Sequence, residues 1–215
     1  TRSLCDWSSD VCSSDLVLIA WDPRRLFRQL FDDEAEMEWF LREVCNHAWN
    51  ERQDAGRPWL EGVAELQARF PDYAPLIDAY RLRWVETLGG AIEGSVALLA
   101  ELKARGVRLL ALTNWSQGTF PVARQRHAFL GWFEGIVVSG EERLIKPDPR
   151  IYQRLLERYG VDPHGALYID DSQRNVEAAE ALGMQGWWFQ HPEGLRGRLQ
   201  ALGLLGNEGR ETSHG

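Results

Sequence analysis

Two adjacent carboxylates, Asp170 and Asp171, end the apolar run ALYID in the stretch YIDDSQRN. Two carboxylates side by side at a buried strand end repel each other unless a cation or hydrogen-bond donors compensate their charge. Oxygen ligands of this kind suit a hard divalent cation, so the pair predicts a Mg²⁺ site. The alternative is that one of the two caps the next helix, a role that Ser172 could also fill.

Two further groups could hold an anion. Thr113 and Asn114 end the run RLLALT, where a hydroxyl and neighbouring backbone N–H groups could bind an anionic oxygen, although Thr and Asn also cap helices. Lys146 in LIKPDP is one of only two lysines in the chain and lies on a loop before a helix. Taken alone, it could equally be an ordinary surface lysine.

Apolar runs alternate with helical patterns along the chain, and these segments must position the groups named above. The apolar runs predict short strands buried on both faces, namely VLIA (17–20), RLLALT (108–113), GIVVS (135–139), ALYID (166–170) and GWWF (186–189). Another segment predicts a helix that Asp148 caps, Pro149 opens and Gly160 ends. The alternation predicts an α/β fold with a doubly wound, Rossmann-like parallel sheet, whose ligands lie at the carboxyl ends of the strands.

A long region after the first predicted strand has helical periodicity throughout and no strand pattern. An all-helical insertion at this point is what a lid over the site would look like. We therefore expect a core made of residues 17–23 and 91–205, an inserted all-helical cap domain at 24–90, and a polar tail at 206–215.

The composition favours a small-molecule partner. The 215 residues are 44% hydrophobic and carry a net charge of -8 without a basic cluster, which argues against a nucleic-acid partner. No apolar run is long enough to span a membrane, and the start of the chain lacks the pattern of a signal peptide, so we expect a cytoplasmic protein with no membrane partner. The three cysteines are too few and too scattered for a disulfide framework.

The first sixteen residues differ from the rest of the chain. Five of its ten serines lie there, and residues 6–16, DWSSDVCSSDL, are what one reading frame of a widely used DNA-sequencing adapter encodes. We therefore expect residues 1–16 to be an artefactual head, which is left out of fold reasoning. The alternative is a genuine flexible N-terminal tail. Because DVCSS is too polar for a core strand, we also expect the first strand of the sheet to be lost.

In the order Thr113, Lys146, Asp170/Asp171, these features resemble the haloacid dehalogenase (HAD) superfamily of hydrolases, over residues 17–205. LTNWS resembles the second motif of that family, KPDPRIYQ the third and IDDSQRN the fourth, and the helical insertion resembles its cap domain. The resemblance implies a phosphatase that hydrolyses a small phosphorylated metabolite, a phosphate monoester, through an aspartyl-phosphate.

The resemblance also implies a role for each matching residue. Thr113 and the amide after it, at Asn114, would bind the phosphoryl oxygens. Lys146 would neutralise charge on the nucleophile and the phosphoryl group, and Asp171, together with Asp170, would help to hold Mg²⁺. Phosphoryl transfer needs positioning and charge neutralisation above all, which these residue types supply.

In the cap, the segment WNERQDAGRPW offers four residues that could reach the substrate, namely Trp49, Asp54, Arg57 and Trp59, and Arg57 would favour an anionic group on it. Packing within the cap, or a salt bridge there, is the commoner role of such a residue.

The nucleophile of the family is an aspartate at the end of the first strand, and here that motif is disrupted. VLIAWDP matches the segment that follows the nucleophile in relatives. Without a gap, Ser13 falls at the nucleophile position, and serine cannot form an aspartyl-phosphate. With a two-residue deletion Asp15 would serve, but Val17 would then stand where many phosphatases keep a second acid. We therefore expect the chain as written to be impaired as an enzyme.

Two other functions compete with the phosphatase reading. A 2-haloacid dehalogenase uses the same aspartate on carbon without a metal, and the Asp170/Asp171 pair argues against it because an acidic pair suits a metal-free carboxylate site poorly. A non-catalytic binding protein would keep the scaffold without the nucleophile, which fits the chain as written. The adapter match explains the same loss more economically.

Overall fold

A computed structural model describes residues 10–13 and 15–206 of the chain. Its main sheet has five strands in the order β5-β4-β1-β6-β7, with every neighbouring pair parallel, namely Gly135–Val138, Leu109–Thr113, Asp10–Ser13, Ala166–Asp170 and Gln185–Trp188. The central strands β4 and β6 are buried along their whole length, whereas the edge strand β7 is partly exposed. The predicted doubly wound parallel sheet is therefore confirmed.

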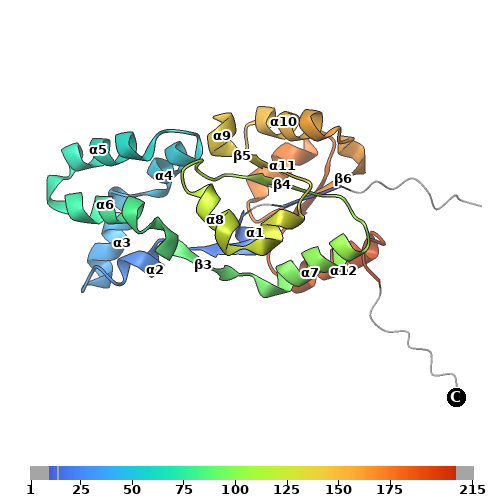
Figure 1. The fold of residues 1–215 in the computed structure, drawn as a ribbon, viewed down its shortest axis with the longest axis horizontal. Helices are drawn as coiled ribbons and strands as arrows, with labels where there is room; N and C mark the ends of the chain where they lie inside the picture. The colour runs from blue at the N-terminus through green and yellow to red at the C-terminus, as the bar shows by residue number, and fades with distance from the viewer. Residues whose placement is uncertain (1–9, 14, 207–215) are drawn as a thin grey trace, which may run out of the picture.

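Helices cover both faces of this sheet (Figure 1). The core helices and turns are α1 (Asp15–Leu18), α7 (Glu93–Ala104), α8 (Phe120–Arg126), η3 (Ala128–Trp132), α9 (Ser139–Glu142), α10 (Pro149–Tyr159), η4 (Pro163–Gly165), α11 (Gln173–Glu180) and α12 (Pro192–Ala201). Successive side chains of β4 point to opposite faces, so Leu110 and Leu112 lie in the core that α10 covers, while Leu109 and Ala111 lie in the core that α7 and α12 cover.

The helix α10 begins and ends as the sequence predicts. Asp148 accepts a hydrogen bond from the backbone N–H of Arg150 at 2.9 Å, Pro149 is the first helical residue, and Gly160 takes the left-handed conformation just past the end. This helix follows directly from the loop that carries Lys146, so its fixed start also fixes where that loop ends.

A helical cap lies beside the core, between β2 (Ile19–Trp21) and β3 (Leu88–Ala91) in the sequence (Figure 1). Its elements are α2 (Arg24–Phe27), α3 (Glu34–Glu43), α4 (His47–Asp54), α5 (Trp59–Arg69), η1 (Pro71–Tyr73), α6 (Ala74–Leu82) and η2 (Trp84–Thr87). Aromatic rings hold it together, because Tyr80 lies 5.5 Å from both Phe27 and Trp49 between ring centroids.

The prediction of a buried core strand over VLIA is wrong. Residues 15–18 form the single helical turn α1, and β2 then pairs antiparallel with β3 in a separate two-stranded sheet at the junction of core and cap. The expectation that the first strand is lost is also wrong, because β1 pairs with both β4 and β6 in the centre of the sheet. Backbone pairing with two apolar neighbours outweighs the low strand propensity of β1.

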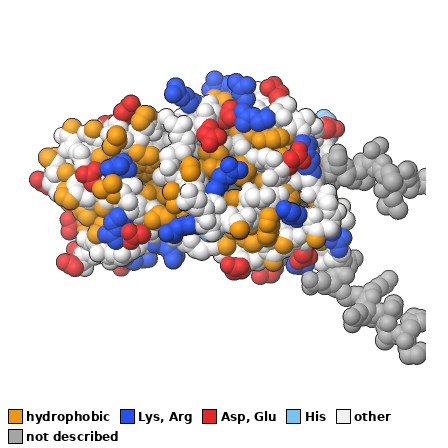
Figure 2. All heavy atoms as spheres, viewed as in Figure 1, with side chains coloured by type: hydrophobic (Ala, Val, Ile, Leu, Met, Phe, Trp, Pro, Cys, Tyr) orange, Lys and Arg blue, Asp and Glu red, His pale blue; other side chains and the backbone are white. Residues whose placement is uncertain are grey.

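Figure 2 shows acidic and basic side chains interleaved over both the cap and the core on the viewed face. No helix in the described ranges is both long enough and apolar enough to cross a membrane.

Gly140 in α9 should not tolerate a side chain. A Cβ at this position would meet the backbone of Gln117 and would lie 2.8 Å from the carbonyl oxygen of Trp115. Because backbone atoms cannot move aside cheaply, we expect Gly140→Ala to lower the free energy of unfolding by about 1–3 kcal/mol in urea titrations. Gly197→Ala in α12, where a Cβ meets open space, is the control and should leave stability unchanged or raise it slightly. Equal stabilities of the two variants would contradict this packing.

Candidate functional site

The carboxyl edge of the sheet borders a cavity of about 210 Å³ between core and cap. Thr113 ends β4, Asp170 ends β6, and β1 runs between these strands with Ser13 opposite Ala111 and Ile169. The core side of the cavity includes Asn114, Lys146, Asp170, Asp171 and Asn175, and the cap side includes four residues of α4. The structure thus brings four of the predicted residues to one cavity, namely Asn114, Lys146, Asp170 and Asp171, as parallel strand ends require.

Lys146 and Asp170 form a buried ion pair at this edge. The Nζ atom of Lys146 lies 3.0 Å from Oδ2 of Asp170, and the two side chains are 3% and 0% exposed. The ammonium also donates to the carbonyl oxygen of Leu112 at 3.0 Å, so two of its three N–H donors are used within the described residues. The third N–H has no acceptor in the part of the chain that the structure describes.

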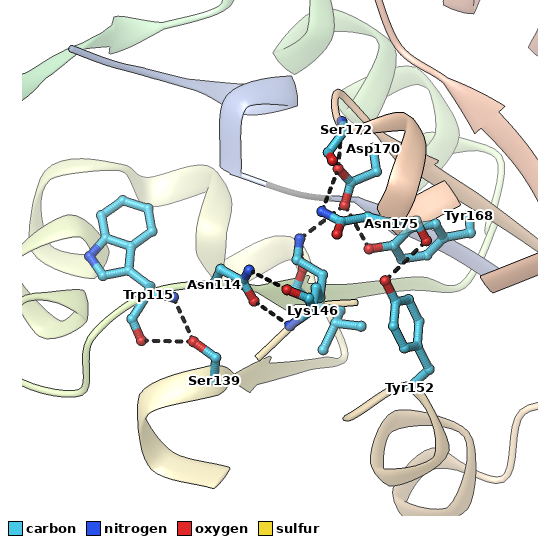
Figure 3. A network of polar contacts seen from close by, with 10 residues as sticks. Asn114, Trp115, Ser139, Lys146, Tyr152, Tyr168, Asp170, Ser172 and Asn175 are labelled. Carbon is cyan, nitrogen blue, oxygen red and sulfur yellow. Dashed lines mark hydrogen bonds and ion pairs between the residues drawn. The ribbon is translucent and has the colours of Figure 1, made fainter. Parts of the chain in front are cut away.

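Asp170 accepts four hydrogen bonds, which Figure 3 shows. Its Oδ2 atom accepts from Lys146 and from the Tyr168 hydroxyl at 2.7 Å, and its Oδ1 atom accepts from the backbone N–H of Ser172 at 2.9 Å and from Nδ2 of Asn175 at 3.1 Å. Burial alone would raise the pKa of this carboxyl group, but the Lys146 charge and these donors hold the pKa below its ordinary value of 3.8.

This arrangement changes the role expected for Asp170. A carboxylate has room for about four hydrogen bonds, and the four donors fill that capacity. Asp170 is therefore placed to hold Lys146, whereas the sequence assigned it to the metal together with Asp171.

Asn114 locks the backbone of the loop that carries Lys146. Its Oδ1 atom accepts the N–H of Lys146 at 2.9 Å, and its Nδ2 atom donates to the carbonyl oxygen of Lys146 at 3.2 Å (Figure 3). Thr113 precedes it, is 3% exposed, and does not itself line the cavity. The Asn114 side chain is thus committed to positioning Lys146.

Asp171 and Asn175 fit a magnesium ion as oxygen donors. Both line the cavity, and the buried Oδ1 atom of Asn175 has no hydrogen-bond partner in the part of the chain that the structure describes. The indole of Trp188 donates to the carbonyl oxygen of Asp171 at 2.9 Å and so fixes the loop between β6 and α11. Within the described ranges, no group of three His, Cys, Asp or Glu side chains could hold a metal ion.

The structure places Arg57 away from the cavity. Its guanidinium donates to Oε1 of Gln53 at 2.6 Å and pairs with Glu65, so its contacts lie between α4 and α5 inside the cap. Arg57 is also absent from the lining of the cavity. The cap salt bridge named as the commoner role for such a residue is the one observed.

The candidate nucleophiles are placed only by their backbone. Ser13 is the last residue of β1, and Asp15 is the first residue of α1. The side chains of residues 10–16 lie outside the described part of the structure, as do residues 1–9 of the proposed head. The assignment of Asp15 as nucleophile therefore stays a prediction.

Sequence reasoning missed three residues that shape the site. Tyr168 supports Asp170, Tyr152 donates to the carbonyl oxygen of Asn175 at 3.0 Å, and Ser139 donates to the carbonyl oxygen of Asp54 in the cap at 2.6 Å. Burial raises the pKa of both tyrosines, so each stays protonated and able to donate. Only Tyr168 left a signal in the sequence, because it lies two residues before Asp170 on one face of a strand.

Comparison with curated proteins finds relatives with two kinds of activity. The sesquiterpene phosphatase astK of Aspergillus oryzae is 36% identical over 90 residues, which cover 42% of this chain and 46% of that protein. The haloacetate dehalogenase H-2 of Moraxella sp. is 30% identical over 91 residues, which cover 42% of this chain and 41% of that protein. The chain thus matches less than half the length of either relative.

Solved structures show the same fold. A HAD family enzyme from Bacteroides thetaiotaomicron, solved as a magnesium complex, has a TM-score of 0.67 and 21% identity, with 86% of this chain and 95% of that chain covered. A sequence profile described as haloacid dehalogenase-like hydrolase matches residues 17–183. Since that match spans most of the chain and the fold agrees with it, the protein belongs to the haloacid dehalogenase-like hydrolase family, as its motifs predicted.

Proposed function

We propose that the natural form of this hydrolase is a Mg²⁺-dependent phosphatase that acts on a small phosphate monoester through an aspartyl-phosphate. The observation that carries the proposal is the buried Lys146–Asp170 pair, which holds a cation at the carboxyl edge with one N–H donor left for a phosphoryl oxygen. The phosphatase among the relatives and the magnesium complex among the solved structures support it.

Each residue then has a defined task. Lys146 and the backbone N–H of Asn114 hold phosphoryl oxygens, and Asp170 keeps Lys146 in place. Asp171 and Asn175 would hold Mg²⁺, which supplies positive charge that offsets the charge of the phosphoryl group.

The attack on phosphorus is the step at which the present chain is impaired, because its nucleophile motif is disrupted. In the proposed reaction of the natural form, the aspartate at the end of the first strand, whose position Asp15 would take here with a two-residue deletion, attacks phosphorus through a carboxylate oxygen. The bond from phosphorus to the ester oxygen breaks as a second acid protonates that oxygen, and water then hydrolyses the aspartyl-phosphate. Val17 is 1% exposed and has no acid group that could protonate the leaving oxygen. A version with the natural start would have both an aspartate at the strand end and room for a second acid.

Dehalogenation is the second candidate. Saturation of Asp170 by four donors leaves at most one carboxylate of the adjacent pair for a metal, which weakens the argument that the pair must bind Mg²⁺. The haloacetate dehalogenase among the relatives supports this alternative. Release of halide from 2-chloropropionate without a metal distinguishes it from phosphate release.

Hydrolysis of p-nitrophenyl phosphate should depend on how the chain starts. The chain as written should hydrolyse it slowly, and a version whose residues 6–16 are replaced by an apolar strand ending in Asp, Leu and two small residues should hydrolyse it much faster. Chelation of Mg²⁺ should abolish the activity of the restored version. Absence of phosphate release by the restored version, with halide release from 2-chloropropionate in its place, would refute the phosphatase assignment.

The contribution of Asp170 to stability should depend on pH. Asp170→Asn should lower the free energy of unfolding at neutral pH by about 3–5 kcal/mol, because Lys146 is left buried without its carboxylate. The pKa of Asp170 is depressed in the folded chain, so the pair contributes fully above 3.8 and its contribution is lost as the pH falls below that value.

Urea titrations of the two proteins at several pH values check this. The stability difference between the chain and Asp170→Asn should stay constant near neutral pH and shrink below pH 3.8. Asp72→Asn, on the exposed surface of the cap, is the control and should change stability by about 0.5 kcal/mol or less. A difference in free energy of unfolding that stays the same below pH 3.8 would show that the Lys146–Asp170 pair is not charged as described.

A further inference from the structure

The wall of the cavity that faces the Lys146–Asp170 pair comes from the cap helix α4. His47, Asn50, Glu51 and Asp54 all line the cavity. They are three or four residues apart and therefore share one face of the helix. The helix start is fixed by Asn46, whose Oδ1 atom accepts the backbone N–H of Trp49 at 2.8 Å.

This wall is fixed relative to the phosphate end of the site. The Ser139 hydroxyl donates to the carbonyl oxygen of Asp54 at 2.6 Å, and the same Ser139 accepts the backbone N–H of Trp115 at 2.9 Å. Since Trp115 follows Asn114 directly, the last turn of α4 is tied to the loop that positions Lys146. Figure 3 shows the core half of this connection.

Asn50 carries an acceptor that no donor satisfies. The residue is 9% exposed, its Nδ2 atom donates to Oδ2 of Asp54 at 2.9 Å, and its buried Oδ1 atom has no hydrogen-bond partner within the described ranges. Rotating the amide by half a turn would place its oxygen against the Asp54 carboxylate, which is unfavourable. The bond to Asp54 therefore fixes the orientation of the amide, and Oδ1 is the atom without a partner within the described residues. The wall therefore lacks a donor, which a bound molecule could supply.

The basic side chains among the described lining residues already face carboxylates. Lys146 lies 3.0 Å from Asp170, Arg174 lies 2.9 Å from Glu51, and His47 lies 3.6 Å from the same Glu51. The rest of the lining includes Trp84 and Trp115, which offer apolar surface. A second anionic group on a substrate would meet the acidic residues of α4 without an uncommitted cation beside it.

We propose that Asn50 and Asp54 determine substrate specificity, by selecting phosphate monoesters whose leaving group is neutral or cationic and carries a hydroxyl or ammonium donor. Esters whose leaving group carries a carboxylate are selected against. The inference rests on the phosphatase function proposed above and adds the chemical class of the leaving group.

Calorimetric titration of the chain with two-carbon phosphate esters in the presence of Mg²⁺ tests the proposal without requiring turnover. Phosphoethanolamine and 2-hydroxyethyl phosphate should bind at least about tenfold more tightly than 2-phosphoglycolate, with ethyl phosphate between them. Orthophosphate serves as the reference for the phosphate end of the site.

Two substitutions on α4 test whether its side chains cause the differences in ester affinity. In Asn50→Leu, phosphoethanolamine should bind no more tightly than ethyl phosphate, while the affinity for orthophosphate stays unchanged. In Asp54→Asn, the difference in affinity between phosphoethanolamine and 2-phosphoglycolate should become smaller. Gln67→Leu is the matched control, because Gln67 bonds to the carbonyl oxygen of Ala74 within the cap and does not line the cavity. It should leave all affinities unchanged.

The outcomes separate this inference from the proposed function. Orthophosphate binding combined with tightest binding of 2-phosphoglycolate would overturn the inference and leave the phosphatase proposal standing, as would an Asn50→Leu variant that weakens every ester and orthophosphate equally. Failure of orthophosphate and of every ester to bind would overturn both.

Discussion

The ion pair between Lys146 and Asp170 is the constraint around which the carboxyl edge of the sheet is built. Burying two opposite charges is costly unless good geometry and further hydrogen bonds compensate for the lost water. The chain supplies these from several elements, since Tyr168, Ser172 and Asn175 complete the shell of Asp170 and the Leu112 carbonyl receives Lys146. The pair thereby fixes the strands β4 and β6, the Lys146 loop and the start of α11 in one arrangement.

The cap completes this site with side chains of a different chemical kind from those of the core. The core presents a lysine ammonium and the oxygens of Asp171 and Asn175, which suit a phosphate and a metal ion, whereas α4 presents acceptors and the aromatic residues present apolar surface. Contacts across the boundary hold the two halves in register, including Trp59 to Ser116 at 2.8 Å and Arg174 to Glu51 at 2.9 Å. Exposed ion pairs contribute little alone, so the partly buried bonds that Ser139 and Ser116 make with the cap contribute more to this alignment.

The sequence predicted those parts that local patterns encode. The runs that became β4 and β6 are apolar throughout, and a polar residue follows or ends each of them, so the edge that carries Thr113 and Asp170 could be recognised. The central strand β1 could not, because its polar residues pair only through neighbours that are distant in sequence. Likewise, Asn50 and Ser139 have no local signal, since their roles depend on how the cap meets the core.

Calorimetric titration of Mg²⁺ and orthophosphate into the chain tests the central claim most directly. The account predicts that orthophosphate binds only with Mg²⁺ and binds at least about tenfold more weakly to Lys146→Met, because a charged donor is lost. Circular dichroism establishes first that the variant is folded. Equal orthophosphate affinity for the chain and a folded Lys146→Met would contradict the claim that the Lys146–Asp170 pair forms a phosphate site.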